Sequence, residues 1–308
     1  FITVENDLMK IIFNNKGGKI ESVELKEYQT FEGNPLIMYD ADSLSTFGME
    51  LIVDGKSIFT DEMYFSAQTK EENIQIKSGK KSVSFRLEAD NNKYIEYLYT
   101  IDANDYMLDF DINIVGLSDE LRVNPYYTFR WNSLIPSLER KESDWERNNT
   151  TIYVKMDNGD VESLGETKEQ DEFMSSARVK WIGFKQQFFS SVLIGKGHID
   201  NPIVKLQTLE DTNPNYLKKF ESEISFPNEK SLNQKAEFAF YFGPNKFSTL
   251  QSYDLGMETM VPLGWGIFGW VNRFIVIPIF NWLGAYINSY GLIILFLTLI
   301  IKLALFPL

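Results

Sequence analysis

The sequence predicts a mainly β protein, a large β-sandwich that is followed by a short helical tail. Along most of residues 1–254, apolar and polar side chains alternate with a period of two, which is typical of strands with one buried face. Asn, Asp and Gly residues interrupt these segments where turns are needed. The rest of the chain, residues 255–308, has almost no charge and carries long apolar runs. These observations predict two parts suited to two different solvents.

The strand pattern is clearest, in chain order, at residues 8–13, 20–25, 49–53, 82–88, 94–101 and 107–115. Asp54-Gly55 lies between apolar runs and predicts a hairpin, because both turn residues take positive φ. Many short strands in one block favour a sandwich over alternating βαβ units. Residues 139–170 are mostly polar, so we expect long loops there around one strand at 151–156. Asn245 is expected to cap a short helix beginning near Phe247.

Charge is divided unevenly along the chain. The sequence has 43 acidic and 30 basic side chains, a formal net charge of −13. Glu258, Arg273 and Lys302 are the only charged residues after position 254, so that part carries +1 and residues 1–254 carry −14. We therefore expect a water-soluble domain at 1–254, with the break near Gly256.

The composition excludes several classes of protein. The excess of carboxylates repels nucleic-acid phosphates, so no nucleic-acid partner is expected. The absence of cysteine excludes disulfides, thiolate nucleophiles and cysteine-bound metals. His198 is the single histidine, which excludes a multi-histidine metal site. We expect no catalytic residue, no metal and no cofactor.

The first part of the tail, residues 264–288, is rich in aromatic side chains and contains Pro278. Aromatic rings with a polar edge suit the headgroup level of a bilayer, so this composition predicts a helix that lies in the membrane interface. It belongs to a linker and amphipathic helix at 255–289. Its expected anchors are Trp265, Trp270, Arg273, Phe274 and Trp282. The alternative is a core helix of the soluble domain.

The last part, residues 290–308, is apolar except for Lys302 and predicts a transmembrane helix. Lys302 lies eleven residues after Gly291, about 17 Å along a helix and past the bilayer midplane. A lysine at this depth either snorkels to the far surface or faces a water-filled groove. Because the chain stops at the end of this helix, we expect it to be a fragment.

Four motifs resemble the YidC family of membrane-protein insertases. Residues 288–308 are similar to the second transmembrane helix of that family, in which one basic residue stands five positions before Pro-Leu, as Lys302 stands before Pro307-Leu308. Upstream motifs, in the family's order, are Trp181 to Phe189, Tyr241-Phe242-Gly243-Pro244 and Leu263-Gly264-Trp265-Gly266.

The resemblance implies a fragment of a bacterial inner-membrane insertase that begins after a first transmembrane helix. Residues 1–254 would be a periplasmic β-super-sandwich like that of galactose mutarotases. Lys302 would be the cation of a hydrophilic groove, where most family members have Arg. A lysine keeps the positive charge but lacks the planar guanidinium group that forms two hydrogen bonds with a carboxylate. Implied partners are nascent membrane proteins, the Sec translocon with its accessory subunits, and the lipid bilayer.

Two rival functions remain open at this stage. The mutarotase-like fold suggests a membrane-anchored carbohydrate-binding or carbohydrate-modifying protein, for which His198 would be the acid–base candidate. His198 follows two glycines and has no second histidine to pair with, so we interpret it as an exposed loop residue. A plain structural anchor is the third possibility.

Overall fold

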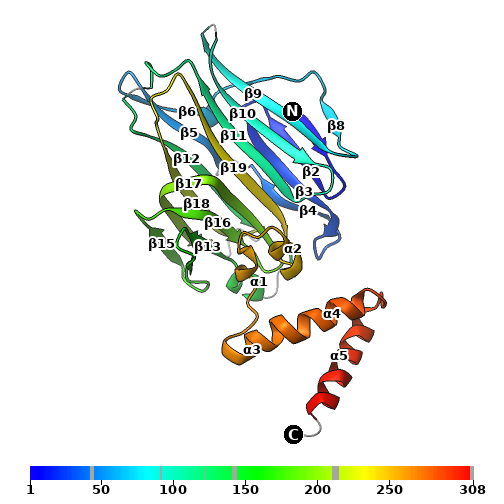
Figure 1. Ribbon diagram of the computed structural model, residues 1–308. Coiled ribbons are helices and arrows are strands. Elements are labelled where there is room, and N and C mark those ends of the chain that lie inside the picture. The colour runs from blue at the N-terminus through cyan, green and yellow to red at the C-terminus, as the bar shows by residue number, and fades with distance from the viewer. Residues whose placement is uncertain (42–44, 91, 122, 141–143, 210–214, 306–308) are drawn as a thin grey trace.

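The computed structural model describes residues 1–41, 45–90, 92–121, 123–140, 144–209 and 215–305. The chain is mainly β, and its strands form two sheets that pack face to face above a helical arm at the C-terminal end (Figure 1). This architecture confirms the predicted β-sandwich.

The smaller sheet contains β1 (Ile2–Glu5), β2 (Met9–Asn14), β3 (Lys19–Gln29), β4 (Pro35–Asp40) and β8 (Asn73–Gln75). Its order is β4-β3-β2-β1-β8, and β1 and β8 run parallel while the other neighbours are antiparallel. Along β2 the residues Met9, Ile11 and Phe13 are buried and alternate with half-exposed neighbours. Every second side chain of the strand therefore contacts the core, as the alternation in the sequence predicts.

The larger sheet has the order β6-β5-β12-β18-β17-β19-β11-β10-β9-β7, with β13 to β16 attached beside β17. Its strands are β5 (Thr46–Val53), β6 (Lys56–Phe59), β7 (Ser66–Ala67), β9 (Lys80–Asp90), β10 (Lys93–Asp102), β11 (Met107–Val115), β12 (Tyr126–Pro136), β13 (Thr151–Met156), β14 (Val161–Ser163), β15 (Gln170–Met174), β16 (Val179–Lys185), β17 (Phe189–Thr208), β18 (Tyr216–Pro227) and β19 (Asn233–Pro244).

The core lies between the two sheets and is built from aromatic rings. Phe13 of the smaller sheet lies 4.6 Å from Tyr99 and 5.8 Å from Phe85 of the larger sheet, measured between ring centroids. Trp131 and Phe184 stack at 4.0 Å with an interplanar angle of 12°. Offset stacks and edge contacts of this kind add to the stabilisation that apolar burial provides.

Strand β17 changes partners along its length. Residues 189–195 pair with β19 and residues 200–208 pair with β18, in both cases antiparallel. Because β18 and β19 themselves run in opposite directions, the chain reverses between Gly195 and Asp200. A Cβ on Gly195 would lie 2.7 Å from the Ile199 side chain, so glycine is needed for this close approach. His198 belongs to this reversal, and its side chain lies outside the described part.

The helices gather at one end of the sandwich, which we call the base (Figure 1). The base is formed by the last residues of β12 and β19 and the first of β17, with the two short helices beside them. These helices are α1 (Asp144–Asn148) and α2 (Phe247–Ser252). The 3₁₀ turns are η1 (Thr60–Glu62) and η2 (Met257–Met260).

Local sequence signals are confirmed where they were strongest. Asp54 and Gly55 have φ of 51° and 74°, and they join β5 and β6 in the predicted hairpin. The expectation for residues 139–170 was partly wrong, because α1 and β14 accompany the predicted strand. Asn245 as a helix cap was also wrong: α2 is preceded by Lys246 and has no side-chain cap. Asn245 instead binds Ser190 and three backbone carbonyls near the start of β17.

Candidate functional site

The C-terminal arm is a helical hairpin that projects from the base (Figure 1). Its first helix comprises α3 (Gly266–Val271), the π-type segment η3 (Asn272–Val276) and α4 (Ile277–Gly284), and its second helix is α5 (Tyr290–Leu305). Pro278 lies inside the first helix, as the second residue of α4 after the π-type segment. A local change in helix type of this kind accommodates a residue that has no N–H to donate.

The predicted aromatic anchors are exposed, Trp265 directly before the first helix of the arm and the others on it. The exposed fraction is 82% for Trp265, 56% for Trp270, 59% for Phe274 and 60% for Trp282. In the most apolar window of this helix, 6% of the residues are buried. The alternative of a core helix is therefore wrong, because a core helix would bury its apolar side chains.

Among the residues that the structure describes, Gly266–Gly284 is the helix that meets the length and hydropathy requirements of a membrane span. Within the described residues the second helix is shorter, with an apolar stretch at Tyr290–Leu303. This order differs from the sequence analysis, which placed the span at 290–308. Pro307 lies outside the described residues.

Lys302 lies near the end of the described part of α5, and its side chain is exposed. Within residues 290–303 the neighbouring side chains are almost entirely apolar, and the Thr298 hydroxyl donates 2.7 Å to the Ile294 carbonyl in its own helix. Lys302 is therefore a single cation on an apolar helix. The groove that would surround it stays a prediction.

The arm is attached to the base by a few specific contacts. The Arg273 guanidinium lies 3.4 Å from Glu258 Oε1 and 5.4 Å from the centroid of the Phe247 ring. Within the arm, Asn272 Nδ2 donates 2.7 Å to the Leu263 carbonyl in the segment that precedes α3. Two cavities lie between the arm and α2, one beside Arg273 and the other beside Phe280. The middle and the C-terminal end of the first helix thus lie beside α2.

The sandwich core extends past the predicted boundary at residue 254. Met257 and Met260 in η2 have no exposed surface and belong to the hydrophobic core. The Trp181 indole N–H donates 2.9 Å to the Leu255 carbonyl. The chain therefore enters the arm only after Met260.

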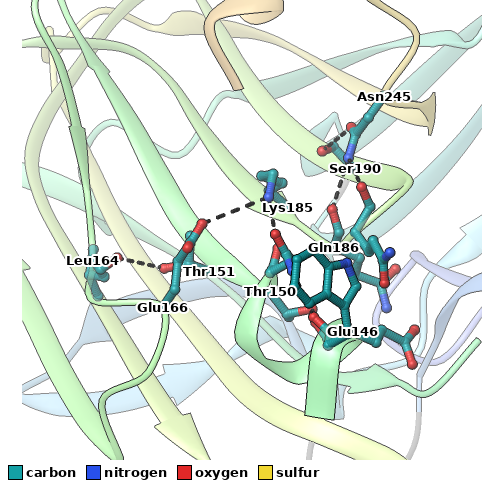
Figure 2. Close-up of polar contacts among 12 residues, drawn as sticks. Glu146, Thr150, Thr151, Leu164, Glu166, Lys185, Gln186, Ser190 and Asn245 are labelled. Atoms are coloured by element: carbon teal, nitrogen blue, oxygen red, sulfur yellow. Dashed lines mark hydrogen bonds and ion pairs between the residues drawn. The ribbon is translucent and has the colours of Figure 1, made fainter. Parts of the chain in front are cut away.

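A buried polar cluster, which was not predicted from the sequence, lies at the base (Figure 2). The Glu146 carboxylate accepts hydrogen bonds from the Leu138 and Glu139 amides and the Ser137 hydroxyl, at 2.9–3.3 Å. Lys185 Nζ donates 2.8 Å to the Asn149 carbonyl and lies 3.9 Å from the Glu166 carboxylate.

Lys218 completes this cluster from β18. Its Nζ atom donates 2.6 Å to each of the Thr150 and Glu166 carbonyls, and the residue has no exposed surface. Along this alternating strand Lys218 has the same inward-facing position as Phe220 and Ile224. This position is the sequence signal that could have identified it. A lysine at a core position requires such partners, because an unbonded buried charge is costly.

Burial changes the acid–base behaviour of the cluster. It lowers the pKa of Lys218 to about 8, while the nearby Glu166 carboxylate acts in the opposite direction. Burial also lowers the pKa of Lys185. The pKa of Glu146 is raised by burial, against the effect of its backbone hydrogen bonds. The cluster has a structural role, since its charged side chains form hydrogen bonds with backbone groups of the same chain.

A cavity of about 280 Å³ lies on the larger sheet beside the reversal that carries His198. Charged side chains in its wall form ion pairs: Arg178 lies 3.4 Å from Asp200, and Lys235 lies 2.7 Å from Glu237. These two carboxylates are thus engaged with cations.

A family model described as the YidC periplasmic domain matches residues 1–281. The chain belongs to the YidC family. The membrane protein insertase YidC of Parabacteroides distasonis is 34% identical over 318 residues, which cover 100% of this chain and 48% of that protein. The YidC of Azobacteroides pseudotrichonymphae is 37% identical, with coverage of 100% and 50%. The chain spans about half the length of these YidC relatives.

Solved structures share the fold of this YidC chain at low identity. The α-N-acetylgalactosaminidase NagBb of Bifidobacterium bifidum is 10% identical, with a TM-score of 0.51 over 85% of this chain and 39% of that chain. A galactose mutarotase-like protein of Lactobacillus casei is 10% identical, with a TM-score of 0.47 over 78% of this chain and 99% of that chain. The structural neighbours of the sandwich thus include galactose mutarotase-like proteins.

Proposed function

We propose that this chain is the periplasmic domain, interfacial helix and second transmembrane helix of an insertase that inserts and folds proteins of the bacterial inner membrane. The observation that carries the proposal is the match of the entire chain to proteins named as membrane protein insertases. The exposed apolar arm fits this function, because apolar surface of this extent requires lipid or protein to cover it.

The first helix of the arm lies in the membrane interface in this proposal, although its length would allow it to span. Arg273 near its middle is held beside Glu258 and Phe247. Phe280 and Gly284 near its end line a cavity together with Lys246 and Ser248 beside the base. Because its middle and its C-terminal end both lie next to the base, the first helix runs below the base of the sandwich (Figure 1), whereas a spanning helix would point away from it.

The second helix, α5, crosses the membrane in this proposal and carries Lys302 into it. It points away from the sandwich (Figure 1). Lys302 faces a hydrated groove formed with further helices of the complete protein. A fixed cation holds water there and attracts acidic side chains of a substrate, which shortens the apolar distance that a polar segment must cross.

No covalent step is required for this function, and we assign no catalytic residue. Partners of the complete protein would be nascent membrane proteins and the lipid bilayer, with the Sec translocon and its accessory subunits as a further partner. The acidic sandwich, residues 1–254, would stand on the periplasmic side of the membrane.

The insertase function is tested by complementation. The complete protein that contains this chain is expressed in a bacterium depleted of its own insertase, and growth and the insertion of a pulse-labelled inner-membrane substrate are measured. We expect both to be restored. Failure of both, with the protein present in the membrane at normal levels, would contradict the proposal.

The carbohydrate alternative is tested separately by calorimetry. The complete protein in detergent is titrated with galactose and glucose up to millimolar concentrations. We expect no heat of binding. Saturable binding that is lost on substitution of Asp200 by Asn, in the wall of the cavity beside His198, would support the alternative.

A further inference from the structure

Three large aromatic side chains are exposed at the base of the sandwich, and we call them the base aromatics. They are Phe31 in the turn between β3 and β4, Trp145 in α1, and Phe188 between β16 and β17. Their exposed fractions are 63%, 65% and 51%. Single exposed apolar residues are common, but large rings gathered at one end of a domain indicate a contact surface.

Backbone hydrogen bonds connect the first two of these residues. The Phe31 amide donates 2.9 Å to the Leu138 carbonyl. The Leu138 amide in turn donates 2.9 Å to the carboxylate of Glu146, the residue that follows Trp145. The turn with Phe31 and the helix with Trp145 are thus fixed to the same short segment.

Phe188 is fixed to this segment through the polar cluster of Figure 2. Gln186 Nε2 donates 2.8 Å to the Pro136 carbonyl, two residues before Leu138. The Phe188 carbonyl accepts 2.7 Å from the Asn245 amide. Asn245 Nδ2 also donates 2.9 Å to the Gln186 carbonyl. The three backbone segments that carry the base aromatics are therefore held together at the base by hydrogen bonds of buried polar groups.

The arm leaves the sandwich from this same surface. Asn245, which binds the turn of Phe188, lies directly before Lys246 and α2, and the arm follows η2. Trp265 and Trp282 on the arm are exposed aromatic residues of the same chemistry. In Figure 1 the first helix of the arm runs below the base, and α5 points farther away. The base thus faces the side on which the arm would meet lipid.

We propose that the base aromatics form a second contact with the lipid bilayer, in which their rings enter the headgroup region on the periplasmic side. Tryptophan is favoured at this depth, and phenylalanine enters it from the apolar face of interfacial helices, because the ring is removed from water without a full crossing of the hydrocarbon. The sandwich would then be held against the membrane at two places, the arm and the base. The inference rests on the proposed placement of the arm in the membrane.

Lipid fits this surface better through its aromatic rings than through charge. Residues 1–254 carry a net charge of −14, which opposes attraction to an anionic membrane. Insertion of rings is driven by removal of apolar surface from water and does not require anionic lipid. The contact is therefore expected in zwitterionic and anionic membranes alike.

The absence of cysteine from these 308 residues allows a direct test. Phe31, Trp145 and Phe188 are replaced one at a time by cysteine in the complete protein, after any cysteine outside this chain has been changed to serine. Each variant is labelled with a fluorophore and reconstituted into phosphatidylcholine vesicles and into phosphatidylethanolamine–phosphatidylglycerol vesicles. Quenching by lipids with a nitroxide on the headgroup is then measured.

Leu232→Cys is the matched negative control, because Leu232 is 66% exposed and directly precedes β19 at the end opposite to the base. The strand of 12 residues between Leu232 and the base is roughly 40 Å long. Trp265→Cys on the arm is the positive control. We expect roughly threefold more quenching at all three base positions than at position 232, in both kinds of vesicle.

Three outcomes would overturn the inference in distinguishable ways. Quenching at position 265 with none at the base would show that the arm lies in the membrane and that the base does not contact lipid. Absence of quenching at position 265 as well would contradict the proposed placement of the arm itself. Base probes that are unquenched by lipid but become protected when purified translocon is added would identify a protein partner instead, and would also overturn it.

Discussion

The Arg273 guanidinium lies 3.4 Å from the Glu258 carboxylate, and this ion pair joins the first helix of the arm to η2 of the sandwich. The two side chains differ in environment: Arg273 is 42% exposed and Glu258 is 14% exposed. The second carboxylate oxygen of Glu258 is buried without a hydrogen bond. The position of the arm thus depends on the Arg273 guanidinium, which neutralises the mostly buried Glu258 carboxylate.

Substitution of Arg273 by Gln is expected to loosen the arm. The carboxylate of Glu258 would lose its cation and draw water into the junction, at a cost in stability of about 1 kcal/mol or less because the pair is partly exposed. Spin labels placed on β19 and α4 should give a broader distance distribution by electron–electron resonance. Lys196→Gln, which breaks an ion pair with Asp109 on the larger sheet, is the control and should leave the distribution unchanged.

Substitution of Lys218 by Met is expected to lower the free energy of unfolding by about 1–3 kcal/mol, because the Thr150 and Glu166 carbonyls lose their donor. Urea unfolding monitored by tryptophan fluorescence provides the measurement. Lys219→Met is the control, since Lys219 is partly exposed on the same strand and pairs with Glu221. Equal stability of the two variants would show that the buried ammonium does not stabilise the base.

The same lysine predicts a dependence of stability on pH. Burial lowers the pKa of Lys218 to about 8 in the folded chain, whereas its ordinary value is 10.5. Between these values the unfolded chain binds a proton that the folded chain does not, so the free energy of unfolding contributed by this group rises as pH rises. We expect the rise between about pH 8 and 10 to be smaller in Lys218→Met. Above that range buried tyrosines, whose pKa is raised, act in the opposite direction.

The extent of the core predicts where the sandwich can be cut. A fragment ending at Asp254 loses Met257 and Met260 from the core, and the Trp181 indole loses its acceptor on Leu255. We expect it to be less stable than a fragment ending at Val261 by several kcal/mol, since removal of one buried methionine side chain costs about 2–5 kcal/mol. Thermal unfolding of the two fragments compares them directly. Identical melting curves would show that the sandwich domain ends at residue 254.

Signals that act over a few residues could be read from the sequence. The Asp54-Gly55 hairpin and the strand Met107–Val115 follow from turn chemistry and from alternation, and both appear with the predicted bounds. Asn245 could not be interpreted in this way. Its partners include Ser190, 55 residues away in the chain, and such a contact exists only once the strands have assembled.

The candidate site also has a part that could be predicted from the sequence and a part that could not. The aromatic residues of the arm were predicted from composition, and their exposure on a helix is confirmed for Trp270 and Trp282. The cluster around Glu146 and Lys218 was missed because its charged side chains are widely separated in the chain and bind backbone carbonyls and amides. The inward position of Lys218 on its strand was its only local signal.

The central claim is that the positive charge of Lys302 assists polar segments across the membrane. The direct measurement is the insertion of a substrate with an acidic periplasmic tail into vesicles that contain the complete protein with Lys302, Lys302→Arg or Lys302→Ala. We expect Arg to support insertion as well as Lys, and Ala to reduce it about tenfold, as for the loss of one favourable charge interaction of about 1.4 kcal/mol. A substrate with a neutral tail should be affected much less. Normal insertion of the acidic substrate by Lys302→Ala, with the protein folded and present in the vesicles, would contradict the claim.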